Sequence, residues 1–189
     1  MDDLALIPGP STVCMGGSTS SIARGQINRS WIPPSQGHVK INVDTAISRN
    51  NDRGSFAAIC RDEHGMYLGF SAVVVQGLVH PKILEAMAFN EALALADDLY
   101  VKKVHIGTDC MATINNLNQI YMGSSSTIVH DIKLKMRELE DVRMEHEKRE
   151  HNSEARNLAK ASCSLDLGRH LWLTDTPSLC MYSLRSELL

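Results

Sequence analysis

The chain of 189 residues is long enough for one typical domain with spare length, and 43% hydrophobic residues allow a buried core. Its formal net charge of −3 excludes wholesale electrostatic attraction to nucleic acid or to an anionic membrane, but not a local basic stripe. No stretch approaches the roughly 20 apolar residues of a spanning helix, and the acidic start "MDDLALIPGP" lacks the basic residues of a signal peptide. The five cysteines are widely spaced, without a C-x-x-C pair, which indicates reduced thiols. We therefore expect an intracellular protein, nuclear or cytoplasmic, without membrane contact.

The chain order of predicted elements indicates an α/β fold. Residues 1–36 are rich in Ser, Gly and Pro and predict a flexible N-terminal tail, whereas 37–165 carry the periodic segments of a domain and 166–189 form a C-terminal extension. Strands are predicted at 39–46, 55–61, 67–75, 102–109 and 142–148. Helices are predicted at 81–99, at 110–119, around the apolar stripe of Ile128, Ile132, Met136 and Leu139, and at 152–164, where Asn152 is the expected cap. Three strands followed by alternating helices and strands predict a mixed sheet with helices packed against it.

Three carboxylates lie at positions where a structural role is not obvious. In "VKINVDTAIS" the apolar residues alternate up to Val43, and Asp44 falls on the opposite face of the strand. Glu85 lies in the first turns of the long helix, and Asp109 ends the fourth strand. Each has a structural alternative: a solvated strand face for Asp44, the helix dipole for Glu85, and a helix cap for Asp109. Taken together, they are the oxygen ligands that Mg²⁺ or Mn²⁺ prefers, and paired ions of this kind catalyse phosphodiester hydrolysis.

Several segments, in order, resemble the ribonuclease H-like domains described as reverse-transcriptase-like, retroelement-derived and abundant in plants. They are "WIPPSQGHVKINVDTA", "GSFAAICRDEHGMYLGFSA", "LEAMAFNEALALA", "VHIGTDC", "MEHEKREHN" and "ARNLAKAS". The match spans about residues 31 to 177 and ends near "HLWLTDTP". The resemblance implies a five-stranded mixed sheet in the order 3-2-1-4-5, flanked by helices, and endonucleolytic cleavage of the RNA strand of RNA–DNA hybrids. It implies that Asp44, Glu85 and Asp109 are the metal ligands and that His146 assists proton transfer or product release.

The sequence departs from the family pattern at two positions. The family's fourth ligand lies four residues beyond the asparagine that opens the last helix, where this chain has Arg156, which cannot ligate a cation. Glu154 and Asn157 point elsewhere around that helix and do not substitute. Thr45 replaces a glycine beside the first ligand.

These departures leave more than one functional reading open. Arg156 could be a surface residue of a degenerate site, it could replace the charge of one ion beside Asp44, or the three acids could keep one or two ions weakly. The alternative to a nuclease is therefore a non-catalytic, retroelement-derived module that binds nucleic acid or a protein, and the chain could also be a fragment of a larger protein. Lys148, Arg149 and Arg156, with Lys160, form a modest basic cluster for a nucleic-acid backbone. We expect a monomer without a small-molecule cofactor.

Overall fold

The computed structural model describes residues 31–77, 80–112, 114–115, 127–173 and 177. The described elements, in chain order, are β1 (Val39–Ser48), the short 3₁₀ helix η1 (Arg49–Asn51), β2 (Arg53–Arg61), β3 (Tyr67–Gln76), α1 (Pro81–Asp98), β4 (Lys103–Thr108), α3 (Thr127–Arg137), β5 (Asp141–His146), α4 (Ser153–Ser162) and β6 (Gly168–Trp172). Most of the helix predicted over 110–119, most of the tail predicted over 1–36 and much of the extension predicted over 166–189 lie outside the described residues.

The sheet has six strands in the order β5-β4-β1-β2-β3-β6. β1, β2, β3 and β6 are joined by antiparallel pairing, whereas β4 runs parallel to both β1 and β5. The parallel pairs require crossover connections, and α1 and α3 lie in those connections. The predicted α/β fold and the strand order 3-2-1-4-5 are confirmed, with β6 added beside β3.

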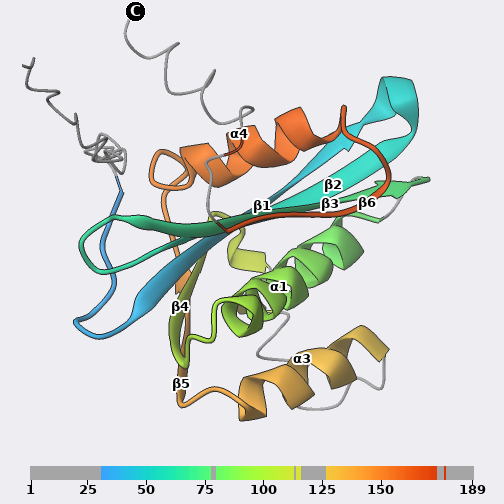
Figure 1. Ribbon diagram of the computed structural model, residues 1–189. Helices are drawn as coiled ribbons and strands as arrows, with labels where there is room; N and C mark the ends of the chain where they lie inside the picture. The colour runs from blue at the N-terminus through green and yellow to red at the C-terminus, as the bar shows by residue number, and fades with distance from the viewer. Residues whose placement is uncertain (1–30, 78–79, 113, 116–126, 174–176, 178–189) are drawn as a thin grey trace, which may run out of the picture.

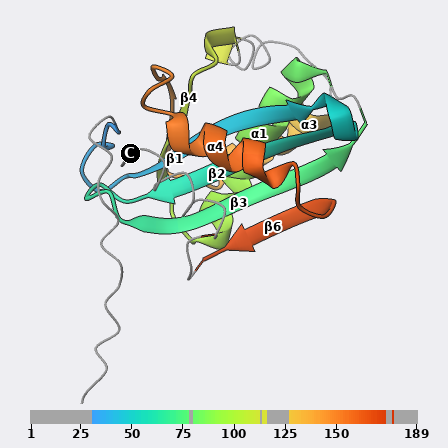
Figure 2. The same ribbon diagram turned by 90° about the horizontal axis from the view of Figure 1, so that it is seen from above.

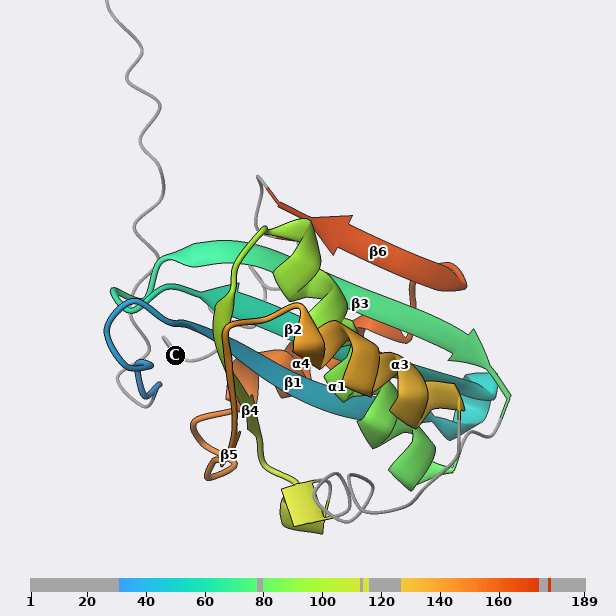
Figure 3. The ribbon, with the colours of Figure 1, turned by 90° about the horizontal axis from the view of Figure 1, so that it is seen from below.

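The helices cover both faces of the sheet. α4 lies across one face and contacts β1, β2 and β3, as the view from above shows (Figures 1 and 2). α1 covers the opposite face and α3 packs on α1 (Figure 3). Both faces of the central strands are therefore buried, as in other sheets covered by helices on two sides.

Alternation along the strands produces two separate apolar clusters. Ile41 and Val43 of β1 pack with Leu84 and Phe89 of α1 on one face. Ala57 and Ile59 of β2 pack with the helix α4 on the other. Because successive side chains of a strand point to opposite faces, the residue after Val43 points toward α4. That residue is Asp44.

The predicted elements in the described residues exist, and their ends differ by a few residues. β1 runs on to Ser48 and β2 begins at Arg53, because the two strands stay paired as far as the Ser48–Arg53 pair. The strand β6 was not predicted. It lies at the edge of the sheet and its pattern of burial is weak, so the sequence carries little period-two signal there.

The segment ahead of β1 packs against the domain. Trp31 is buried, and its indole N–H donates a hydrogen bond to Oδ1 of Asn42 at 3.0 Å. The guanidinium of Arg61 lies 5.1 Å from the centre of the Trp31 ring, within the range of a cation–π contact. None of the described helices is long and apolar enough to span a bilayer. The described cysteines Cys60, Cys110 and Cys163 are free.

Candidate active site

The surroundings of Asp44 disfavour the charged form of its carboxyl group. Its Oδ1 accepts a hydrogen bond from the backbone N–H of Thr45 at 2.6 Å, whereas Oδ2 is buried and has no hydrogen-bond partner among the described residues. The pKa of Asp44 is raised to about 6, chiefly by burial and then by the nearby carboxylate of Asp109. The Thr45 N–H and the charges of Arg156 and Arg149 act in the opposite direction. The effects that disfavour the charged carboxylate therefore outweigh the charges of the two arginines, neither of which forms an ion pair with Asp44.

Asp109 lies beside Asp44 because of the register between two parallel strands. Asn42 of β1 pairs with Gly107 of β4. Asp44 lies two residues after Asn42, and Asp109 lies two residues after Gly107. Because β1 and β4 run in the same direction, the two side chains meet where β4 ends, beside the middle of β1. The sheet itself therefore positions this pair of acids.

Glu85 reaches the same place from α1, but its carboxylate is engaged. The neighbours Leu84, Ala88 and Phe89 are buried against the sheet, which places Glu85 at the rim of the helix–sheet contact. The thiol of Cys110 donates a hydrogen bond to Oε1 of Glu85 with a sulfur–oxygen distance of 3.1 Å. Glu85 lies beyond the first turn of α1, so the helix dipole alone does not account for it.

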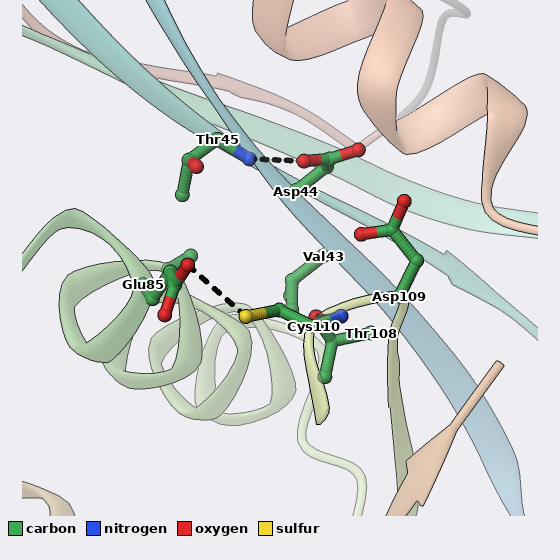
Figure 4. Close-up of a pocket in the computed structure, with 8 residues that line it drawn as sticks. Val43, Asp44, Thr45, Glu85, Thr108, Asp109 and Cys110 are labelled. Atoms are coloured by element: carbon green, nitrogen blue, oxygen red, sulfur yellow. Dashed lines mark hydrogen bonds between the residues drawn. The ribbon is translucent and has the colours of Figure 1, made fainter. Parts of the chain in front are cut away.

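One small cavity joins the three acids. It has a volume of about 70 Å³ and is lined by Val43, Asp44, Thr45, Glu85, Ala88, Thr108, Asp109 and Cys110. In the close-up, Glu85 and Cys110 face one another on one side, and Asp44 and Asp109 lie on the other (Figure 4). This space is enough for an ion with water, but not for a nucleotide. The structure thus brings together residues that are up to 65 positions apart in the sequence.

The donor set of this cavity meets part of the needs of a divalent cation. Carboxylate oxygens suit Mg²⁺ or Mn²⁺, and the partnerless Oδ2 of Asp44 is the kind of atom that a cation satisfies. However, in the described part of the chain no group of three or more His, Cys, Asp or Glu side chains is arranged to hold a metal ion. The residues therefore fit one cation at Asp44 and Asp109 better than a pair of cations.

Two arginines lie beside Asp109, at the side of the cavity that we call its mouth. Nε of Arg149 is 3.7 Å and Nη1 of Arg156 is 4.0 Å from Oδ2 of Asp109. Arg149 comes from the loop after β5, with a side chain 77% exposed, and Arg156 from the first turns of α4, with a side chain 20% exposed. The nearby Glu154 cannot take the place of a ligand, because it pairs with Arg61 and accepts a hydrogen bond from Tyr67.

Asn152 begins α4, as predicted, but its side chain does not cap the helix. Nδ2 donates to the backbone oxygen of Val43 at 2.9 Å, and Oδ1 accepts from Nδ2 of Asn42 at 3.1 Å. The side chain thus ties the start of α4 to β1 directly beside Asp44. Tertiary hydrogen bonds have replaced the expected local one.

A buried polar network extends from this contact, and sequence reasoning missed it. Nδ2 of Asn42 also donates to Oε2 of Glu147 at 2.9 Å, and Glu147 forms an ion pair with the buried Lys40. Nζ of Lys40 further donates to the backbone oxygen of Ile32 at 3.0 Å. Lys40, Asn42 and Asp44 are spaced two residues apart on one face of β1. That polar period-two stripe was a usable signal.

The remaining candidates lie outside the cavity. His146 ends β5, is exposed and pairs with Thr108 across the β4–β5 ladder, one residue before Asp109. Lys148 is exposed in the loop that follows. Neither contributes to the cavity lining.

Comparisons with known proteins agree with this architecture. A model of the family described as "Reverse transcriptase-like" matches residues 42–162. The structure is similar to the crystal structure of RNase H1 from the halophilic archaeon Halobacterium salinarum, with a TM-score of 0.57 and 16% identity over 67% of this chain and 96% of that one. It is also similar to the N-terminal RNase H domain of a Mycobacterium tuberculosis protein, solved as a fusion with maltose-binding protein, with a TM-score of 0.59 and 15% identity over 67% of this chain and 93% of that one. A comparison with curated proteins gives no match.

Proposed function

Because the chain belongs to the reverse transcriptase-like family and has an RNase H-like fold, we propose that it is a ribonuclease H-type endonuclease. Its substrate is the RNA strand of an RNA–DNA hybrid. One observation carries the proposal: Asp44, Glu85 and Asp109 line a single cavity at the carboxyl end of β4, beside β1. The ligand-binding crevice of α/β sheets lies at this edge.

Asp44 and Asp109 are the residues that would hold a divalent cation, with Glu85 as the third ligand after its hydrogen bond to Cys110 is broken. When bound, Mg²⁺ or Mn²⁺ lowers the pKa of an attacking water and neutralises charge on the phosphodiester. The protein's own contribution is to hold the two aspartates in fixed register on adjacent strands and to keep Oδ1 of Asp44 oriented through the Thr45 N–H.

The exposed side chains around the cavity have supporting roles in this proposal. His146 assists proton transfer or product release from the end of β5. Lys148 and Arg149 contact backbone phosphates, a kind of binding that depends on salt and not on base sequence. The A-form shape and 2′-hydroxyls of the hybrid provide the recognition.

A second function is favoured by a specific observation. Arg156 lies 4.0 Å from Asp109, where it competes with a cation for the same carboxylate. If that competition prevails, the protein is a catalytically degenerate module that binds nucleic acid or a protein partner with the same surface.

A cleavage assay separates the two functions. Purified protein is mixed with Mg²⁺ or Mn²⁺ and a hybrid labelled on the RNA strand, and the products are resolved by length. The first proposal expects RNA-strand cleavage that Asp44→Asn abolishes, because the substitution removes a charged ligand. Equal inactivity of both proteins contradicts it. The Arg156→Asp variant then tests degeneracy: cleavage gained on this change shows an intact scaffold lacking one ligand, and continued inactivity supports the binding module.

A further inference from the structure

Two guanidinium groups from different elements converge on one carboxylate at the edge of the candidate active site. Arg149 and Arg156 both approach Oδ2 of Asp109, at 3.7 and 4.0 Å. Their positive charges also act on Asp44 across the cavity mouth. Two arginines thus offset two aspartates, in a place where acids alone would repel a phosphate group.

These guanidinium groups have donors to spare. Both distances to Asp109 exceed a normal hydrogen bond, and neither group donates a hydrogen bond to another described residue. A guanidinium carries five N–H donors in a planar fork, which matches the oxygens of a phosphate. The geometry leaves room for a second acceptor beside Asp109.

The segment that carries both arginines is fixed to the sheet. Glu147, buried before the loop, pairs with Lys40, and Asn152 at the start of α4 donates to the backbone of Val43. Arg149 and Arg156 lie on either side of Asn152. Their backbones are therefore held at a set position relative to Asp44, so that only the side chains remain to be ordered when a ligand binds.

We propose that Arg149 and Arg156 together form a phosphodiester-binding site that holds a nucleic-acid backbone without a divalent cation. The proposal rests on the proposed function only in taking a nucleic acid as the ligand. The neighbouring cavity of about 70 Å³ is too small for a nucleotide base. The ligand is therefore a backbone phosphate at the cavity mouth, and binding is independent of base sequence.

The test is fluorescence anisotropy of a labelled RNA–DNA hybrid titrated with protein in EDTA, at several salt concentrations. Arg149→Gln, Arg156→Gln and the double variant are compared with wild type. Arg137→Gln is the control, because it removes the same charge from an exposed position at the end of α3, on the other face of the sheet. Circular dichroism checks the fold of each variant.

Wild type is expected to bind in EDTA, and each single variant at the mouth to weaken binding roughly tenfold, the effect of losing one charge-assisted hydrogen bond. The slope of log affinity against log salt should fall by about one, while Arg137→Gln stays close to wild type. Absence of wild-type binding in EDTA overturns the inference, as does equal weakening by Arg137→Gln.

Failure of this inference and failure of the nuclease proposal are distinguishable, because the assay involves no cleavage. Metal-free binding that depends on the arginines, in a protein that cuts no hybrid, supports the inference and contradicts the nuclease. Cleavage of the hybrid by a protein whose binding does not depend on the arginines supports the nuclease and contradicts the inference. If Arg156→Gln fails to fold, the Arg149→Gln variant, changed at an exposed position, tests the inference by itself.

Discussion

Replacement of Asp44 by asparagine should stabilise the protein, although Asp44 is proposed as a metal ligand. Its pKa is raised from an ordinary value of 3.8 to about 6, mainly by burial and then by Asp109. A rise of the pKa from 3.8 to about 6 corresponds to a cost of about 2 to 3 kcal/mol for the charged form in the folded state. Asparagine removes the charge and keeps an oxygen that can accept from the Thr45 N–H.

The sign of the pH dependence follows from the raised pKa. Below about pH 4 the carboxyl is protonated in both the folded and the unfolded protein, so wild type carries no penalty. As the pH rises through about 6, the folded protein also loses the proton, and the full penalty is present at pH 7 and above. The advantage of Asp44→Asn should therefore be about 2 to 3 kcal/mol at pH 8 and vanish below pH 4.

Urea denaturation followed by circular dichroism, at pH values from 4 to 8 in EDTA, measures this difference as the change in the free energy of unfolding. Glu138→Gln is the matched control, because it removes one exposed negative charge beyond the end of α3. An advantage that is absent at pH 8, or that is equal at all pH values, would refute the conclusion that the surroundings of Asp44 disfavour its charged form.

Three further predictions concern the buried network and the cation. Gly107→Ala should destabilise the fold by about 1 to 3 kcal/mol in urea denaturation. The added Cβ would lie 3.0 Å from Nδ2 of Asn42 and 3.0 Å from Cδ of Glu147. Unchanged stability would contradict the rigid packing of that network. Lys40→Met should cost about 3 to 5 kcal/mol, since it leaves Glu147, which is 4% exposed, without its ion-pair partner; a loss below 1 kcal/mol would show that Asn42 alone satisfies the carboxylate. Millimolar Mn²⁺ should raise the melting temperature of wild type in a thermal-shift assay but not that of Asp109→Asn; an equal rise in both proteins would place the cation elsewhere.

The order of elements was predictable because each has a clear local signal. The alternation up to Val43 indicates β1, and the dense Ala and Leu pattern after Pro81 indicates α1. β6 was missed because an edge strand such as Gly168–Trp172 is held by backbone pairing with β3 and needs little apolar alternation. Propensity carries no information about a partner that is distant in the chain.

The candidate site was likewise predictable from the sequence only in part. Asp44, Glu85 and Asp109 attract attention as acids at unusual positions, and the structure places all three on one cavity; their role as ligands stays a proposal. The side chain of Asn152 was expected to act within its own helix, but it bonds to β1 instead. Such a contact depends on the register of β1 and on the packing of α4. Neither can be read from the segment "NSEARNLAK".

The burial of Trp31 has a practical consequence for expressing the domain. The regular spacing of apolar residues begins near residue 37, which makes that position an attractive place to start a shortened protein. A chain trimmed there would lose the indole that donates to Asn42 and the backbone oxygen of Ile32 that accepts from Lys40. Recombinant boundaries should begin upstream of Trp31, or the polar interior around Lys40 and Asn42 will be left open to water.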